Sequence, residues 1–311
     1  MALINVLVAA LVFYIACRTA LCWSATGVAR EHLGRMALKT AHLGCGEMTY
    51  LDESTGDRPR SEVVAGESPE LVPLLSIHGT FGGADRGLDA CRDFGPGFRV
   101  IAPSRFGYLG SDVAGEGTPA DQARAYVELL DELGVERAFV VATSGGAASA
   151  LRLALDHPER VRGLILRSAL MPPAGVPSKA PSGVRLPAPL LTDLGLYLVA
   201  PLLAAVTGLP MSAADRMLPV AERRRGVELD LSVTDVDMAR NYDSYQLEGL
   251  SVPALMLRAR GDKMTSGADA DAAADRIPGC ELVQFETGGH ALVGHSDEIR
   301  AKVRAFVRSA S

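Results

Sequence analysis

Six short apolar segments between residues 74 and 285 most constrain how this chain can fold. They are Leu74–Ile77, Phe98–Ala102, Phe139–Ala142, Leu164–Leu166, Ala254–Leu257 and Leu282–Phe285. Their residues do not alternate between apolar and polar, which is typical of strands buried on both faces of a parallel sheet. The sequence therefore predicts an α/β fold with a mostly parallel, doubly wound sheet.

The stretches between these segments carry helix signals. Thr118 is a predicted N-cap, Pro119 suits the first turn, and Gly134 is expected to end that helix. Close to the C-terminus the apolar residues recur at helical spacing, at Ile299, Val303, Phe306 and Val307. Residues 54–71 are rich in polar residues, glycine and proline, and are predicted to form a loop.

Composition excludes several classes of protein. The 311 residues include 31 basic and 37 acidic side chains, so the net charge of −6 argues against a nucleic-acid binder. The 48% hydrophobic content argues against a disordered chain. The cysteines are odd in number and scattered, and they show neither zinc-site spacing nor a disulfide framework. They are Cys17, Cys22, Cys45, Cys91 and Cys280.

Residues 2–17 carry no charged side chain and form a predicted N-terminal hydrophobic segment within residues 1–22. As a helix this run would be about 24 Å long, slightly short of a hydrocarbon core of about 30 Å. We favour a membrane anchor. Basic residues follow the run with only Glu31 opposing them, which predicts a cytoplasmic catalytic domain; they are Arg18, Arg30, Arg35 and Lys39. A cleaved secretory signal, a lipoprotein signal ending at Cys17 and a soluble helix are the alternatives.

Ser144 lies where a predicted strand turns into a helix of small residues, within FVVATSGGAASAL (139–151). A nucleophile on such a sharp turn needs small neighbours, and Ala142 and Gly146 stand two residues to either side. The hydroxyl would lie at a helix N-terminus, where the dipole favours developing negative charge. Taken alone this string is weak, because an N-cap serine explains it equally well.

Two further residues strengthen the interpretation of Ser144 as a nucleophile. Asp262 follows the strand at 252–257, and His290 follows the final strand after two glycines. A serine, an aspartate and a histidine in this chain order, each after a strand, are what a nucleophilic triad on a parallel sheet requires. The Gly-rich residues 78–83, after another strand, can present backbone N–H groups to an oxyanion.

These motifs resemble those of the α/β-hydrolase superfamily, in its HG-x branch with a serine nucleophile. The matching strings are IHGTFGG (77–83), VIAPSRFGYLGSD (100–112), ATSGGA (142–147), DHPERVRGLIL (156–166), RARGDK (258–263) and GGHALVGH (288–295). The resemblance implies a hydrolase core of residues 46–170 and 250–311, with residues 171–249 (hereafter the insert) as a helical cap.

The resemblance also implies the roles of the site residues. Ser144 would be the nucleophile, His290 the general base and Asp262 its orienting carboxylate, while Thr80 and Gly145 would supply oxyanion-hole N–H groups. Neither cofactor nor metal is required.

Three histidine, arginine and tyrosine positions near these motifs have other expected roles, and one histidine is a rival to His290. His295, five residues after His290, is a rival base. His78 belongs to the HG turn and is expected to shape that loop. Arg105 and Tyr108 are expected to hold the following loop, with Tyr108 able to reach the pocket rim.

The insert is where substrate choice is expected to lie. Residues 186–210 are nearly all apolar, and we prefer cap helices that roof the site over a second membrane span. This roof could also rest on the bilayer beside the anchor. Residues 222–235 (ERRRGVELDLSVTD) are expected to form an exposed helix and loop. Asp237 and Asp243 become candidate acids only if the insert folds across the sheet.

The sequence thus predicts a serine hydrolase that cleaves an ester, thioester or lactone of a hydrophobic acyl group through an acyl-enzyme. A carbon–carbon bond hydrolase and a cofactor-free haloperoxidase-like perhydrolase are the alternatives within the enzymes, followed by a proline iminopeptidase-like peptidase. A catalytically idle ligand receptor is the alternative of a different class. The partners expected are a small hydrophobic substrate and a membrane, and no nucleic acid.

Overall fold

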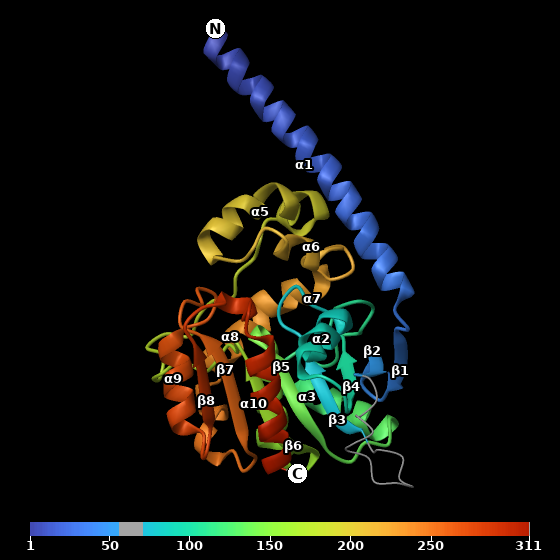
Figure 1. Cartoon of the computed structure of the whole chain (residues 1–311), viewed down its shortest axis with the longest axis vertical. Helices are drawn as coiled ribbons and strands as arrows, with labels where there is room; N and C mark the ends of the chain where they lie inside the picture. Colours follow the sequence, from blue (N-terminus) through green and yellow to red (C-terminus); the bar gives the residue numbers. More distant parts are fainter. Residues whose placement is uncertain (56–70, 311) are drawn as a thin grey trace.

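One sheet organises the computed structural model, which describes residues 1–55 and 71–310 (Figure 1). Within these residues it has eight strands in the order β1-β2-β4-β3-β5-β6-β7-β8. The strands are β1 (Lys39–Leu43), β2 (Gly46–Ser54), β3 (Val72–Ile77), β4 (Phe98–Pro103), β5 (Ala138–Thr143), β6 (Val161–Arg167), β7 (Ala254–Ala259) and β8 (Glu281–Phe285). β2 is antiparallel to both β1 and β4, and all pairs from β4 to β8 are parallel. The predicted, mostly parallel sheet is confirmed.

Among the described residues, five helices cover the two faces of this sheet: α2 (Ala84–Cys91), α3 (Pro119–Glu132), α4 (Ala147–Asp156), α9 (Gly267–Arg276) and α10 (Ser296–Ser309). The other helices of these residues are α1 (Ala2–Arg35), α5 (Asp193–Thr207), α6 (Ala213–Met217), α7 (Arg224–Leu229) and α8 (Asp235–Arg240). Apolar residues of α3, α4 and α9 pack into one hydrophobic cluster, and those of α2 and α10 pack into another on the opposite face. The central strands contribute to both clusters.

β5 shows why the apolar strand segments do not alternate with polar residues. Val140 and Ala142 pack with α3 and α4, whereas Phe139 and Val141 pack with α2 and α10. Since both faces of the strand are covered by helices, every position along it favours an apolar side chain.

The predicted helix ends and faces are confirmed where the structure describes them. Thr118 caps α3 by accepting a hydrogen bond from Asp121 N–H, and Pro119 is its first residue. The predicted apolar face of α10 is buried. Most of the predicted loop at residues 54–71 lies outside the described residues.

The insert lies between β6 and β7 and contains α5 to α8. The apolar stretch 186–210 is divided into a 3₁₀ turn and α5, which begins after the N-cap Thr192 and ends at Gly208. At 15 residues α5 is shorter than the roughly 20 needed to cross a bilayer. The structure therefore gives no support to a second membrane span in this stretch.

Residues 222–235 contain a helix, α7, as expected, but they are only partly exposed, and the prediction of exposure is wrong for two of their charged residues. Arg223 and Asp230 are both buried, with 0% and 1% of their surface exposed. They can be buried because each is paired with an opposite charge outside the insert, Arg223 with Asp85 and Asp230 with Arg105. Charged residues in a sequence predict exposure only when such partners are lacking.

α1 extends well past the apolar run, to Arg35, and is 34 residues long. By length and composition its N-terminal part could cross a membrane, which is compatible with either an anchor or a signal sequence. Its C-terminal half packs against the insert, where Cys22 shares a hydrophobic cluster with Leu196 and Tyr197 of α5. Figure 1 shows α1 running past α5 and projecting beyond the rest of the molecule.

Candidate active site

Ser144 sits on a sharp turn between β5 and α4, where the sequence predicted it. Its φ of 52° lies in the left-handed region, which is rarely adopted by residues other than glycine. A 3₁₀ turn at Ser144–Gly146 then leads directly into α4. Backbone strain of this kind costs on the order of 1–3 kcal/mol and is concentrated at functional sites. The turn presents a partly buried serine at the N-terminal end of a helix.

Glycines make this turn possible because other chain segments approach it closely. A Cβ on Gly146 would lie 2.6 Å from the His78 carbonyl oxygen, and one on Gly79 would lie 2.9 Å from the Ser144 Cβ. Both distances are shorter than side chains tolerate. The Gly-rich residues 78–83 after β3 are thereby held directly against the serine turn.

Asp262 and His290 meet as the chain order predicted. His290 Nδ1 lies 2.8 Å from Asp262 Oδ2, and both side chains are largely buried. Asp262 also accepts hydrogen bonds from Met264 N–H and the Thr265 hydroxyl. Burial alone would raise the pKa of Asp262, but the hydrogen bonds to His290 and these donors hold it below its usual value. The carboxylate is therefore ionised at neutral pH and accepts the Nδ1 proton of His290.

The three predicted site residues follow strands β5, β7 and β8, which run parallel in one sheet. Their carboxyl ends therefore lie at the same edge of the sheet. Although both residues are described, the structure contains no direct hydrogen bond between Ser144 and His290. Catalytic hydrogen bonds are often long in the absence of substrate and shorten when it binds.

Thr80 and Gly145 are neighbours, as the oxyanion-hole expectation requires. A Cβ on Gly145 would lie 2.8 Å from the Thr80 hydroxyl oxygen. Thr80 belongs to the Gly-rich residues after β3, and Gly145 follows Ser144 at the start of α4. Two loops from adjacent strands thus converge on one side of the serine.

Asp235, at the start of α8, is a site residue that sequence analysis missed. Its Oδ1 would lie 2.9 Å from a Cβ on Gly145. This oxygen is buried and has no hydrogen-bond partner in the described structure. Burial raises the pKa of Asp235, and the nearby positive charge of Arg105, which acts to lower it, does not cancel this effect. In the sequence, Asp235 is one of several acidic residues in a polar stretch, so no local pattern distinguishes it from the others.

His78 has the structural role predicted for it. Its Nε2 accepts a hydrogen bond from Arg105 N–H at 2.9 Å, while Nδ1 lies 2.7 Å from the Gly79 carbonyl oxygen. The ring is therefore neutral with its proton on Nδ1. Burial and the Arg105 guanidinium hold the pKa of His78 well below its usual range.

Arg105 and Tyr108 hold the loop after β4, as expected, but they do so through the insert. Both side chains bond to the carboxylate of Asp230, and the Arg105 guanidinium also donates to the His78 carbonyl. Tyr108 additionally accepts a hydrogen bond from Phe81 N–H. One buried aspartate of the insert thus fixes the loops after β3 and β4.

A second buried ion pair joins the insert to the same loops. Arg223 donates two hydrogen bonds to Asp85, at 3.0 and 2.8 Å, and a further one to the Gly82 carbonyl. Asp85 lies in the first turn of α2, directly after the Gly-rich residues. The insert is therefore attached to the oxyanion side of the site by two charge pairs.

His295 is not the partner of Asp262, so its candidacy as the base is not supported. Its Nε2 lies 3.2 Å from the Thr287 hydroxyl and its Nδ1 lies 3.2 Å from Glu298. Asp237 bonds to Asn241 and Tyr245 within the insert, and Asp243 is exposed. The acid that the insert brings to the serine turn is Asp235 instead.

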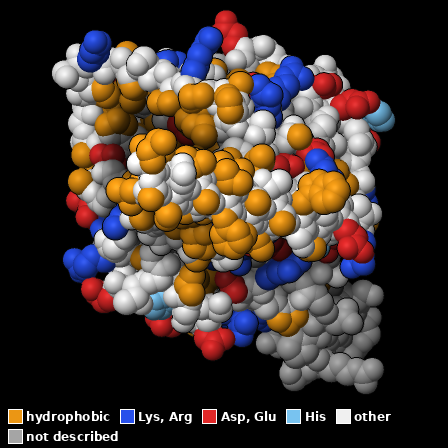
Figure 2. Space-filling model, turned by 90° about the horizontal axis from the view of Figure 1, so that it is seen from above, with side chains coloured by type: hydrophobic (Ala, Val, Ile, Leu, Met, Phe, Trp, Pro, Cys, Tyr) orange, Lys and Arg blue, Asp and Glu red, His pale blue; other side chains and the backbone are white. Residues whose placement is uncertain are grey.

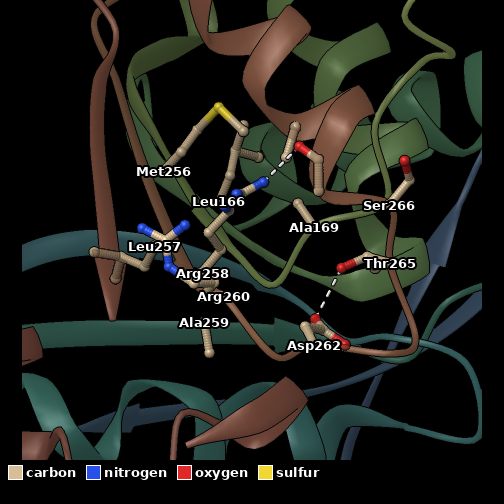
Figure 3. A pocket seen from close by; sticks show the side chains of 12 residues that line it. Leu166, Ala169, Met256, Leu257, Arg258, Ala259, Arg260, Asp262, Thr265 and Ser266 are labelled. Atoms are coloured by element: carbon tan, nitrogen blue, oxygen red, sulfur yellow. Dashed lines mark hydrogen bonds between the residues drawn. The ribbon is translucent and has the colours of Figure 1, made fainter. Parts of the chain in front are cut away.

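A small pocket of about 20 Å³ lies beside Asp262, between the ends of β6 and β7 and the start of α9 (Figure 3). Figure 3 shows Thr265 bonded to Asp262 at its edge. The volume is enough for about one water molecule and too small for a substrate. Among the described residues, no group of three or more histidine, cysteine, aspartate or glutamate side chains is arranged to hold a metal ion.

Comparisons with known proteins agree with this fold. Residues 72–190 match the family described as alpha/beta hydrolase fold, and residues 231–311 match the family described as TAP-like protein. The 2-hydroxy-6-oxo-6-phenylhexa-2,4-dienoate hydrolase of Comamonas testosteroni is 38% identical over 106 residues, or 32% of this chain. The match spans only 37% of that relative's length.

Solved structures match over most of the chain. An alpha/beta hydrolase fold protein from Nakamurella multipartita has a TM-score of 0.66 at 25% identity, covering 88% of this chain and 100% of its own. A membrane phospholipase A described as a bacterial virulence factor has a TM-score of 0.61 and covers 99% of this chain and 97% of its own. At 19% identity that likeness shows the fold alone. The sheet, the matched families and the Nakamurella multipartita structure show that this chain belongs to the α/β-hydrolase superfamily.

Proposed function

We propose that this chain is a serine hydrolase in which Ser144 attacks a carbonyl carbon. The observation that carries the proposal is the left-handed backbone of Ser144 on the turn between β5 and α4. A strained serine at this position is the arrangement of a nucleophile elbow. The Asp262–His290 pair at 2.8 Å supplies the base that such a hydroxyl needs at neutral pH.

The reaction follows from the positions of these groups. Because Asp262 holds the Nδ1 proton of His290, Nε2 is free to take the proton of the Ser144 hydroxyl as Oγ bonds to the carbonyl carbon. The N–H groups of Thr80 and Gly145 stabilise the oxyanion that forms, at about 3 kcal/mol each. His290 then returns the proton to the leaving group. In the second half of the reaction His290 takes a proton from water as it attacks the acyl carbon, and it returns this proton to Ser144 Oγ as the acyl–enzyme bond breaks.

The comparisons favour a carbon–carbon bond as the bond that is cleaved. The compound named for the Comamonas testosteroni relative carries keto, hydroxyl and carboxylate groups and no ester, so its hydrolysis must break a carbon–carbon bond. In this reaction the leaving carbon takes the electron pair and then the proton held by His290. The acyl group remains on Ser144 until water removes it.

An ester of a hydrophobic acyl group is the second candidate, and the charges around the site favour it. A dienoate substrate needs a positive group for its carboxylate. Arg105 and Arg223, the buried arginines that bond to the loops around Ser144, are already paired with Asp230 and Asp85. Uncharged substrates do not require such a group.

A substrate comparison with the purified full-length protein tests the proposal. It would measure turnover of medium-chain p-nitrophenyl esters and of 2-hydroxy-6-oxo-6-phenylhexa-2,4-dienoate, each with wild type and with Ser144→Ala. We expect turnover of at least one class, lost in the variant. The class of substrate that is turned over shows whether an ester bond or a carbon–carbon bond is cleaved. Unchanged rates in Ser144→Ala would contradict the role of Ser144 as the nucleophile.

We further propose that α1 is retained as a membrane anchor, with the catalytic domain on the cytoplasmic side. Its C-terminal half completes the hydrophobic cluster of the insert, and Arg30 lies within 3.6 Å of Asp193 and 3.5 Å of Glu222. Removal of a signal sequence from this position would leave part of that cluster without its partner. The excess of basic residues after the apolar run supports the cytoplasmic side.

Mass analysis of the membrane-bound protein tests this anchor. We expect residues 1–35 to be present after carbonate extraction, and a C-terminal tag to be digested by protease only after the cytoplasmic face is exposed. A shortened, extractable protein would show that the segment is a cleaved signal.

A further inference from the structure

The exposed face of the insert next to α1 is unusually apolar. Residues 194–214 carry no charged side chain. From this stretch, large apolar side chains are exposed, with 66% of Leu202 and 65% of Val206 accessible. We define the α5 surface as the exposed residues Leu194, Leu202, Leu203, Val206 and Met211. Figure 2 shows hydrophobic side chains gathered across the face seen from above, where α1 and α5 lie.

Specific contacts fix the position of α5 along the axis of α1. The Tyr14 hydroxyl donates to the Leu198 carbonyl at 2.9 Å, and Arg18 donates to the Tyr197 carbonyl at 3.0 Å. The Arg18 guanidinium also lies over the Tyr197 ring, 4.5 Å from its centre. Hydrogen bonds and a cation–π contact therefore join α5 to residues 14–18 of α1.

The position of these contacts fixes where α5 lies relative to a membrane. An α-helix needs about 20 residues to cross a hydrocarbon core of about 30 Å. A span beginning at Ala2 therefore ends close to Leu21, within the part of α1 that contacts α5. Tyr14 and Arg18 precede that end, and Arg30, which lies 3.6 Å from Asp193 of α5, follows it. If α1 spans the bilayer, α5 must lie in its interfacial layer and cannot be in free solution.

The residues near this boundary have the chemistry of a membrane interface. Trp23, the single tryptophan of the chain, is 86% exposed on α1 just past the expected end of the span. Tryptophan and tyrosine are enriched at the level of the lipid headgroups. Arg18, the first charged side chain after the N-terminal methionine, bonds to α5 rather than entering the apolar stretch unpaired.

We propose that the α5 surface is a second lipid-binding site, which lies in the same bilayer leaflet that α1 enters. This inference rests on the proposed anchor but not on the proposed reaction. α1 supplies the span, and the α5 surface holds the insert against the interface by burying its apolar side chains in lipid. The insert is thereby placed between the lipid and the loops around Ser144, so that a membrane-dissolved substrate meets the insert first.

Quenching of tryptophan fluorescence by brominated lipids tests the proposal on the full-length protein. The protein is reconstituted in phosphatidylcholine vesicles with and without brominated acyl chains. Wild type reports the position of Trp23 directly. Leu202→Trp and Val206→Trp, each in a Trp23→Phe background, report on the α5 surface. Glu136→Trp in the same background is the control, because the exposed Glu136 lies before β5, at the opposite edge of the sheet from Ser144.

We expect brominated lipid to reduce emission at least twofold for wild type and both α5 variants, and to leave the control unchanged. Unquenched Trp23 would contradict the anchor itself. Quenched Trp23 with unquenched α5 indoles would contradict the α5 surface alone. Shielding of these indoles from both lipid and aqueous acrylamide would assign the surface to a second copy of the chain and also overturn the proposal.

Discussion

At the scale of single residues, the site depends on close backbone approach around Ser144. Gly146 allows the His78 carbonyl to come within 2.6 Å of where a Cβ would stand. We expect Gly146→Ala to push the Gly-rich residues away from the serine, to lower stability by about 1–3 kcal/mol and to abolish most activity. Gly249→Ala is the matched control, because nothing lies within 4 Å of its Cβ position. Urea unfolding and turnover measured on both variants test this prediction. Equal losses of stability and activity in Gly146→Ala and Gly249→Ala would contradict the role of Gly146 in close backbone approach.

Asp262 acts through the tautomer of His290. An amide at this position can donate a hydrogen bond to Nδ1, which would leave the proton on Nε2 and prevent it from accepting the proton of Ser144. We therefore expect Asp262→Asn to lower kcat by about 10³- to 10⁴-fold while the fold remains intact. Asp243→Asn, at an exposed acid of the insert, should be neutral. A fall of less than tenfold in kcat for Asp262→Asn would contradict the assignment.

Asp235 makes stability depend on pH. Because burial raises the pKa of this carboxyl in the folded state, the unfolded chain releases its proton first as the pH rises above about 4. Stability therefore falls from that pH until the folded pKa is reached, and then levels off. We expect Asp235→Asn to remove this loss, so that its free energy of unfolding relative to wild type increases between pH 4 and pH 7. An unchanging difference across this range would show that Asp235 is not desolvated.

At the scale of elements, two buried ion pairs attach the insert to the catalytic loops. Breaking a buried pair leaves a charge without a partner and costs about 3–5 kcal/mol, whereas an exposed pair contributes about 0–1 kcal/mol. We expect Arg223→Met to destabilise the protein by the larger amount. Arg224→Met, which removes an exposed pair with Glu228, is the neighbouring control. Combining Arg223→Met with Asp85→Leu should recover part of the loss, and similar unfolding curves for the two single variants would contradict this account.

The same elements show what sequence analysis can and cannot reach. The strand at 139–142 and the N-cap Thr118 were predictable because a strand covered on both faces and a helix start leave local patterns. The edge strand β1 was not predicted, since its exposed and buried positions are mixed and it has no apolar run. The burial of Arg223 and Asp230 leaves no local pattern, because the partners that bury their charges lie far away in the sequence.

At the scale of the whole molecule, the insert packs against both the loops around Ser144 and α1. It is tied to the loops around Ser144 through Asp85 and Arg105, and to α1 through the cluster that contains Cys22. Sequence order predicted Ser144, Asp262 and His290 because parallel strands bring their ends to one edge. It could not place Asp235 beside Gly145, since that depends on how the insert docks.

Labelling with a fluorophosphonate tests the central claim, that Ser144 is an activated nucleophile, most directly. Intact-mass and peptide analysis of the folded full-length protein should find a single adduct on Ser144. The adduct should be absent from Ser144→Ala and form much more slowly in His290→Ala. A well-folded wild-type protein that forms no adduct, or an adduct that persists in Ser144→Ala, would contradict the claim.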